Sequence, residues 1–85
     1  MKKNQIVNPL IKARMGQEWS IEVSEKPFVE GRGSNMPALG YPCGVCGLKE
    51  TKLRFAKSTE EEESSLEWIE LQCKRCNSYT LYTKK

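Results

Sequence analysis

The 85-residue chain contains no histidine and only four cysteines. Without histidine, the commonest general base of enzymes and the commonest metal-binding imidazole are both missing. No apolar run approaches the roughly 18 residues that a membrane helix needs. The opening Met-Lys-Lys-Asn-Gln is not followed by the apolar segment of an export signal. We therefore expect a cytoplasmic protein with reduced cysteines and no membrane partner.

Apolar residues make up 38% of the sequence and charged residues 29%. A chain of this length forms one small domain with a limited hydrophobic core, so a metal ion is a plausible substitute for missing apolar contacts. The formal net charge is +3, and four thiolates with one Zn²⁺ would lower it to about +1. Net charge therefore does not indicate a nucleic-acid-binding protein, and only the distribution of charge can do so.

The cysteines form two Cys-x-x-Cys pairs separated by residues 47–72. This spacing lets a tight turn aim both sulfur atoms at one point, and four thiolates complete the tetrahedral shell that Zn²⁺ prefers. Gly44 and Gly47 suit the first turn because glycine adopts positive φ without strain. Asn77 takes the place of Gly47 in the second turn, and asparagine tolerates the same conformation. The predicted ligands of one structural Zn²⁺ are Cys43, Cys46, Cys73 and Cys76.

Other interpretations of the cysteines stay open. Two disulfides would fit a small secreted domain, but no export signal is apparent, and two redox pairs in one short domain fit a shared metal better. The segment Tyr41-Pro-Cys-Gly-Val-Cys-Gly is similar to the first knuckle of rubredoxins, electron carriers that hold one iron with four cysteines. The second pair departs from that family, because Lys74 and Arg75 lie between its cysteines and Asn77 follows them.

Residues 1–42 are predicted to form an N-terminal arm with a short helix, a strand and a linker. Asn8 can cap a helix in which Pro9 takes the first position. Residues 17–23 alternate between apolar and polar side chains, which is typical of a half-buried strand. Residues 30–42 are rich in glycine and proline and have no periodicity, so we expect a linker. The apolar side of the predicted strand consists of Trp19, Ile21 and Val23.

Residues 43–85 are predicted to form a zinc ribbon with four cysteine ligands. The expected strands are residues 52–57, 66–72 and 78–83. In the first of them, Leu53 and Phe55 are predicted to share one face and Lys52 and Arg54 the other. The predicted fold is therefore small, metal-stabilised and mainly β: a three-stranded antiparallel zinc ribbon with an N-terminal arm that contains a short helix and a strand.

Residues 43–85 resemble the zinc ribbons of the transcription machinery, in particular those of transcript-cleavage elongation factors. The shared pattern is Cys-x2-Cys, strand, acidic turn, strand, Cys-x2-Cys and an aromatic strand. Those factors carry an Asp-Glu pair at the hairpin tip that helps to hold a catalytic metal inside RNA polymerase. The segment Ile69-Glu-Leu-Gln-Cys-Lys-Arg-Cys-Asn is also similar to the second knuckle of the Com family, phage proteins that bind messenger RNA and activate translation. In this chain the tip holds Glu60, Glu61, Glu62 and Glu63.

A basic surface is the first candidate for function. Lys74 and Arg75 lie between two predicted metal ligands, at the tip of a rigid turn where they can contact phosphate. Tyr79 on the adjoining strand can stack on a base, and Lys52 and Arg54 add a basic edge. Together with the resemblance, these residues predict an adapter that binds nucleic acid or the transcription or translation machinery, with RNA polymerase or a ribosome-associated protein as partner.

The alternative function is a protein-interaction module that regulates or inhibits a larger enzyme, with purely structural zinc. Its contact would be made by Glu60–Glu63 or by Trp19. The pattern favours a solvated turn for the four glutamates and a core position for Trp19, and contact with a partner is the alternative for each. A rubredoxin-like electron carrier is a further alternative. No catalytic residue and no small-molecule substrate are expected, because four cysteine ligands leave Zn²⁺ no open position and no serine or lysine lies in a recognisable catalytic frame.

Overall fold

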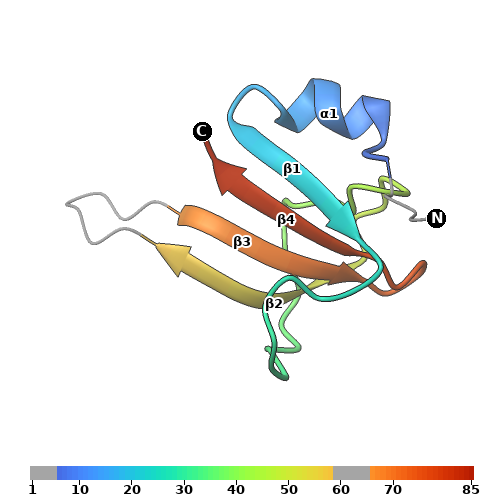
Figure 1. Ribbon diagram of the computed structural model, residues 1–85. Helices are drawn as coiled ribbons and strands as arrows, with labels where there is room; N and C mark the ends of the chain where they lie inside the picture. Colours follow the sequence, from blue (N-terminus) through green and yellow to red (C-terminus); the bar gives the residue numbers. More distant parts are fainter. Residues whose placement is uncertain (1–5, 59–65) are drawn as a thin grey trace.

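The computed structural model describes residues 6–58 and 66–85, and the predicted acidic turn with Glu60–Glu63 lies outside them. In the described chain one short helix precedes four strands: α1 (Pro9–Met15), β1 (Trp19–Ser24), β2 (Thr51–Ser58), β3 (Leu66–Cys73) and β4 (Tyr79–Lys84). The strands form one antiparallel sheet in the order β1-β4-β3-β2 (Figure 1). The prediction of a mainly β, antiparallel fold is confirmed, whereas the predicted number of three strands is wrong.

The additional strand is β1, which comes from the predicted arm. It pairs along β4 from Trp19 opposite Lys84 to Ser24 opposite Tyr79. Without β1, the edge of β4 would present unpaired N–H and C=O groups. The ring of Trp19 also packs edge-on against Tyr82, with 6.0 Å between the ring centroids. The sheet thus takes strands from both predicted segments, and the domain boundary after residue 42 stays a prediction.

The helix α1 is short and depends on tertiary contacts. The Asn8 side chain caps it by accepting a hydrogen bond from Leu10 N–H at 2.9 Å, and Pro9 occupies the first turn. Two turns are unstable alone in water, but Ile11 is only 3% exposed and anchors the helix in the core. With seven residues, this helix of the described chain is too short to cross a membrane.

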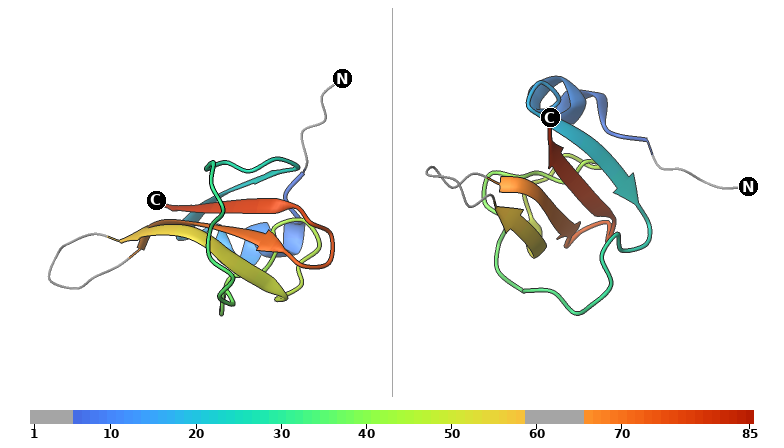
Figure 2. Two further views of the ribbon diagram at one scale, coloured as in Figure 1. Left: turned by 90° about the horizontal axis from the view of Figure 1, so that it is seen from below. Right: turned by 60° about the vertical axis from the view of Figure 1, so that its left-hand side comes forward.

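One face of the sheet, which we call the helix face, carries the hydrophobic core. Ile69 lies opposite Tyr82, and Leu71 shares their face two residues further along β3. The helix α1 covers part of this face (Figure 2). Figure 2 shows α1 on one side of the sheet and the segment that follows β1 on the other. The buried cluster consists of Ile11, Trp19, Ala38, Ile69, Leu71 and Tyr82.

Residues 25–37, which we call the strap, wrap round the sheet. From the end of β1 the strap crosses the face opposite to α1, passes the outer edge of β2 and reaches the helix face at Ala38 (Figures 1 and 2). At the edge of β2, Leu53 N–H donates to Met36 O at 2.7 Å. Part of the predicted linker therefore covers a strand edge that would otherwise be open to pairing with another chain.

The second face of the sheet, the strap face, is shaped by a bulge in β2. Leu53 lies opposite Leu71, and the next pair is Phe55 opposite Glu70, so Arg54 is an extra residue without a partner. The bulge turns Leu53 to the helix face and Phe55 to the strap face. The predicted shared face of these two residues is therefore wrong.

A buried ion pair lies at the centre of the strap face. Arg54 is 6% exposed and Glu70 is 0% exposed, and Arg54 Nη1 lies 3.4 Å from Glu70 Oε2. The guanidinium donates to the carbonyl oxygens of Val29 at 3.2 Å and Gly31 at 2.6 Å. Phe28 N–H donates to the same carboxylate oxygen at 2.8 Å. The pair fastens the strap to the sheet, while Glu70 Oε1 is buried without a hydrogen-bond partner among the described residues.

Replacing Arg54 by methionine is expected to lower the free energy of unfolding by about 3–5 kcal/mol, because the Glu70 carboxylate would stay buried without its cation. Adding Glu70→Leu to this variant is expected to restore most of the loss. The measurement is urea unfolding of the metal-loaded protein followed by tryptophan fluorescence.

The matched control is Lys57→Met. Lys57 lies on β2, as Arg54 does, and forms an exposed ion pair with Glu67 of β3. Exposed pairs contribute about 0–1 kcal/mol, so this variant should unfold almost like the parent protein. Equal losses for Arg54→Met and Lys57→Met would show that the buried pair does not hold the strap.

Candidate metal centre

Two short turns bring the four cysteines together at one end of the sheet. The turns are residues 43–47, knuckle 1, and residues 73–77, knuckle 2. They close with the same backbone hydrogen bond, from Gly47 N–H to Cys43 O at 3.0 Å and from Asn77 N–H to Cys73 O at 3.1 Å. Gly47 and Asn77 both adopt positive φ, 80° and 63°. The predicted equivalence of these two positions is confirmed.

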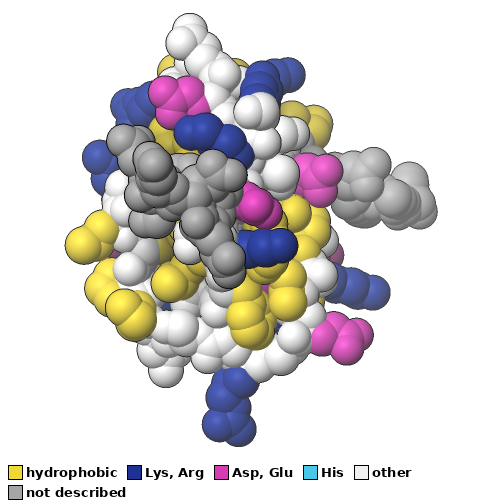
Figure 3. Space-filling view, turned by 90° about the vertical axis from the view of Figure 1, so that its left-hand side faces the viewer, with side chains coloured by type: hydrophobic (Ala, Val, Ile, Leu, Met, Phe, Trp, Pro, Cys, Tyr) yellow, Lys and Arg dark blue, Asp and Glu magenta, His cyan; other side chains and the backbone are white. Residues whose placement is uncertain are grey.

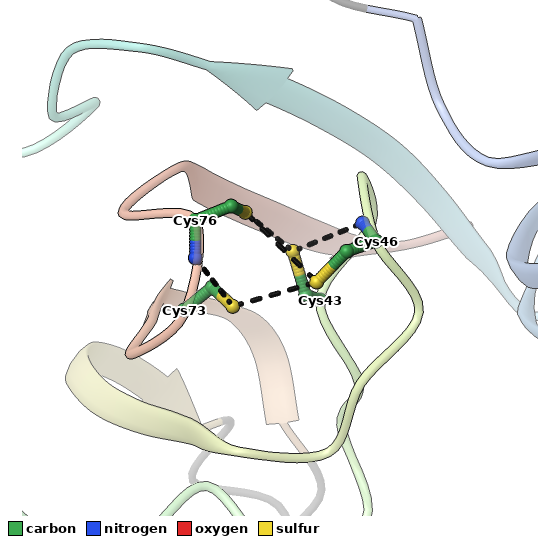
Figure 4. A group of neighbouring side chains, drawn as sticks. All are labelled: Cys43, Cys46, Cys73 and Cys76. Carbon is green, nitrogen blue, oxygen red and sulfur yellow. Dashed lines mark hydrogen bonds between the residues drawn. The ribbon is translucent and has the colours of Figure 1, made fainter.

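The four Sγ atoms lie within 4.8 Å of one another, and Figure 4 shows them pointing to a common centre. Sγ–Sγ distances are 3.7 Å for Cys43–Cys76, 3.6 Å for Cys46–Cys73 and 3.9 Å for Cys46–Cys76. Sulfur atoms bound tetrahedrally at about 2.3 Å from a Zn²⁺ ion lie about 3.8 Å apart, whereas a disulfide needs about 2.05 Å. The four thiols are free, and their arrangement is suited to holding one metal ion.

In each knuckle the first cysteine is buried and the second is exposed. Cys43 and Cys73 are 0% exposed, whereas Cys46 and Cys76 reach the surface. Each buried sulfur accepts two backbone N–H groups of its own knuckle, at 3.3 and 3.5 Å for Cys43 and at 3.3 and 3.4 Å for Cys73. Such hydrogen bonds spread the negative charge of a thiolate ligand, so the buried sulfurs are prepared for a metal by the fold of the turn.

Strand β4 fixes the position of knuckle 1. Gly44 N–H donates to Thr80 Oγ1 at 3.0 Å, and Tyr82 O–H donates to Pro42 O at 2.7 Å. A Cβ atom on Gly44 would lie 2.7 Å from Val23 Cγ1 and 3.0 Å from Thr80 Cγ2. The φ of Gly44 is not positive, so close approach to the sheet, rather than the predicted backbone conformation, requires glycine here.

The fold shifts the pKa values of the thiols in different directions. Burial raises the pKa of Cys43 to about 12 and also raises the pKa of Cys46. Burial acts in the same direction on Cys76, but hydrogen bonds with the side chain and backbone of Ser78 and with the thiols of Cys43 and Cys73 together outweigh it and lower the pKa of Cys76 to about 7. Burial and the charge of Cys43 raise the pKa of Tyr82. A metal ion must displace protons from thiols, so its binding weakens as the pH falls.

The predicted cations of knuckle 2 lie at the surface. Lys74 and Arg75 are both exposed, and Arg75 Nη1 lies 3.4 Å from Glu50 Oε1 in an exposed pair. Lys74 N–H donates to Glu50 O at 2.9 Å, which ties knuckle 2 to the segment after knuckle 1. Lys52 is half-buried, and its Nζ lies 3.5 Å from Asn35 Oδ1.

Three other predicted contact residues are buried or half-buried. Arg54 is withdrawn from the predicted basic edge, because the bulge buries its guanidinium against Glu70. Its guanidinium lies 5.2 Å from the ring centroid of half-buried Tyr79, so one face of that ring is covered. Trp19, predicted as a partner contact or a core residue, is 8% exposed and packs edge-on against Tyr41 with centroids 5.8 Å apart.

Sequence reasoning missed the residues that hold the knuckles and the strap. One signal was present: Glu70 interrupts an apolar run in β3 and Arg54 interrupts one in β2, and opposite charges in neighbouring apolar strands can pair across a sheet. No local signal pointed to Thr80 or Tyr82, because their partners Gly44 and Pro42 lie far away in the sequence.

Comparison of the chain with protein-family models, curated proteins and solved structures gives no match. The metal centre is therefore inferred from the convergence of the four sulfur atoms itself.

Introducing a methyl group at Gly44 is expected to push knuckle 1 away from β1 and β4. We expect Gly44→Ala to lower the free energy of unfolding of the metal-loaded protein by about 1–3 kcal/mol, as overpacking does in a well-packed core. Metal affinity, measured by competition with a chromogenic chelator, should fall in parallel because the position of Cys43 depends on the same contact.

The matched test is the double variant Gly44→Ala/Val23→Ala, which removes the Cγ1 atom closest to the new methyl group. The double variant should be more stable than the sum of the two single losses implies. Strict additivity would contradict the close approach of Gly44 to β1.

Proposed function

We propose that the four cysteines hold one Zn²⁺ ion that acts structurally. The sulfur–sulfur distances near 3.8 Å and the two N–H groups at each buried sulfur support this assignment. Four thiolates leave the ion no open position for water or substrate, so we also propose that the chain is not an enzyme. Zinc then compensates for the small core of so short a chain.

The arrangement of elements supports a zinc ribbon, as the resemblance to ribbons of the transcription machinery suggests. Knuckle 1, β2, β3, knuckle 2 and β4 follow one another in the order of that resemblance, and β1 is an addition. On this basis we propose a small cytoplasmic adapter that binds nucleic acid or the transcription or translation machinery.

The observation that carries this proposal is the pair of cations at the tip of knuckle 2. Lys74 and Arg75 lie between two cysteines whose sulfurs point to the metal centre, so the backbone beneath them is held in place while their side chains reach solvent. The carboxylate of Glu50 is 58% exposed beside Arg75. Exposed pairs of this kind are weak, so a phosphate group can replace the glutamate.

The neighbouring sheet extends this surface. Lys52 lies opposite Gln72, and Gln72 lies opposite Tyr79, so the three residues form a row across β2, β3 and β4 next to knuckle 2. The row combines a cation, an amide and an aromatic ring. Proteins that bind single-stranded nucleic acids use such side chains to contact phosphates, to form hydrogen bonds and to stack on bases. Arg54 covers one face of Tyr79, which limits stacking to the other.

A protein-interaction module is the second candidate function, and exposed apolar side chains between β1 and β2 favour it. Leu39 is 81% exposed, Met36 61% and Leu48 41%, and exposed apolar surface can mark a contact site. A partner that remains bound in a pull-down after nuclease treatment would favour this function, whereas loss of every partner would favour nucleic acid.

Removal of the metal by a chelator under reducing conditions is expected to abolish cooperative unfolding. Structural zinc contributes about 10–16 kcal/mol of apparent binding free energy at pH 7, which is as large as the whole stability of about 5–15 kcal/mol that a domain usually has. Metal analysis should give one zinc per chain, and zinc added back should restore the melting transition seen by circular dichroism.

Unchanged melting of the reduced, metal-free chain would contradict a structural metal. A red, iron-containing protein would instead favour the rubredoxin-like electron carrier.

Reversing the charge at the tip of knuckle 2 is expected to weaken nucleic-acid binding. We expect Lys74→Glu/Arg75→Glu to bind a labelled single-stranded RNA or DNA about tenfold or more weakly at low salt. The slope of the logarithm of the binding constant against the logarithm of the salt concentration should become shallower by about one or more, because two phosphate contacts disappear. Fluorescence anisotropy at several salt concentrations gives both values, and zinc content shows that the site is intact.

The control is Arg14→Glu/Lys57→Glu, which makes the same change of net charge at exposed positions in α1 and near the end of β2. Binding that falls equally in both double variants would show a general charge effect and not a contact at knuckle 2.

A further inference from the structure

A groove of about 600 Å³ lies beside β1 and α1. It is at the end of the sheet where Trp19 pairs with Lys84, whereas the other end of β1, where Ser24 pairs with Tyr79, adjoins knuckle 2. The groove is therefore separate from the surface proposed for nucleic acid. The lining residues that matter here are Lys12, Ala13, Trp19, Ile21 and Lys85.

The edge of β1 that borders the groove has unused backbone groups. Lys85 N–H donates to Glu18 O at 3.0 Å, which makes this pair a hydrogen-bonded one in the antiparallel ladder. Because such pairs alternate with non-bonded ones, the N–H and C=O groups of Trp19, Ile21 and Val23 point away from β4. In residues 6–58 and 66–85, no other strand pairs with this edge.

The charges around the groove favour an acidic partner. Lys12 and Lys85 line it, and none of its lining residues within the described chain is acidic. Figure 3 faces the end of the molecule where β1 begins and β4 ends, and shows Lys and Arg side chains in its upper part, with acidic side chains also on this face. Ile6, which also lines the groove, is 81% exposed.

We propose that β1 binds an extended peptide segment as a fifth strand of the sheet, with an apolar side chain in the groove and acidic residues on both sides of it. The backbone groups of Ile21 would form a hydrogen-bonded pair with one peptide residue, whose side chain then points to the same face as Ile21. Side chains two positions before and after share that face. One of them lies opposite Trp19, at the end of β1 where Lys85 lines the groove and its amine also donates to Gly16 O. Lys12 lines the same groove from α1.

This partner differs in chemistry from the proposed partner of knuckle 2. An apolar residue flanked by carboxylates matches the apolar lining and the two lysines, whereas a nucleic acid would place phosphates and polar bases against Ala13 and Ile21. The inference therefore does not depend on the proposed function, and the two surfaces can be occupied together.

The test uses the zinc-loaded full chain and a fluorescein-labelled peptide, Asp-Glu-Val-Leu-Val-Glu-Asp. In this peptide the leucine fits the groove, and the two glutamates lie on its face. N-methylation of the leucine removes the N–H that would bond to Ile21 O, and binding measured by anisotropy should weaken by about tenfold or more. N-methylation of the first valine is the matched control, because its N–H points away from β1, and this peptide should bind like the parent peptide.

Protein variants complete the test. Lys12→Glu should weaken binding about fivefold or more, whereas Lys26→Glu, an exposed lysine outside the groove, should leave it unchanged. In amide NMR spectra, the signals of Trp19, Ile21 and Val23 should shift on titration, and those of Lys74 and Arg75 should not.

Three results would overturn the proposal. One is the absence of binding at peptide concentrations up to about 1 mM, where even a weak complex of about −4 kcal/mol would be detected. Another is equal binding of the two N-methylated peptides. The third is a shift of the β1 signals with protein concentration alone, which would make a second copy of the chain the occupant of this edge.

Discussion

The convergence of four sulfur atoms is the constraint on which the rest of the structure depends. Cys43 and Cys46 precede β2, whereas Cys73 and Cys76 join β3 to β4, so the two knuckles meet only if the sheet is formed. Contacts on several sides hold them there, including the hydrogen bond from Gly44 to Thr80 and that from Lys74 to Glu50. Burial raises the pKa of Cys43, so without a cation this thiol keeps the proton that a metal ligand must lose. A metal ion resolves that conflict, because it stabilises the thiolates that burial disfavours.

A second constraint follows from the small size of the chain, which has one short helix in its described part to cover a sheet with two faces. The helix and the residues after Ala38 bury one face, and the strap has to cover the other without regular structure of its own. Its backbone groups need partners, and Arg54 and Glu70 supply them by bonding to Phe28, Val29 and Gly31. A buried ion pair often adds little net stability compared with apolar residues, but it leaves few alternative arrangements. In this protein it fixes both the path of the strap and the register of the bulge.

The sequence predicted the local features well and the long-range ones poorly. The turns that carry the cysteine pairs and the positive φ of Asn77 follow from spacing within a few residues, and the strand at Trp19 follows from its alternation. The pairing of that strand with β4 and the burial of Arg54 could not be predicted in this way. A bulge shifts the alternation by one residue, which turns a residue predicted for the surface into a buried one. Periodicity indicates that a strand exists, but it does not say which edge the strand joins.

The two edges of the sheet are treated differently, and this asymmetry bears on function. The strap pairs with β2 through Leu53 and through an isolated bridge from Pro37 to Lys52, so much of that edge is occupied. The edge at β1 has no corresponding cover within the described chain. Proteins usually protect exposed edges by charge, by proline or by a covering segment, because open edges pair with other chains. Here the open edge borders a groove that has apolar lining residues and the two lysines Lys12 and Lys85. Such a groove would let β1 pair with a peptide of matching side chains, whereas a protected edge would prevent every pairing. The end with the four cysteines and the open edge at β1 thus give one small sheet two separate surfaces, and these are the two places at which we propose contacts.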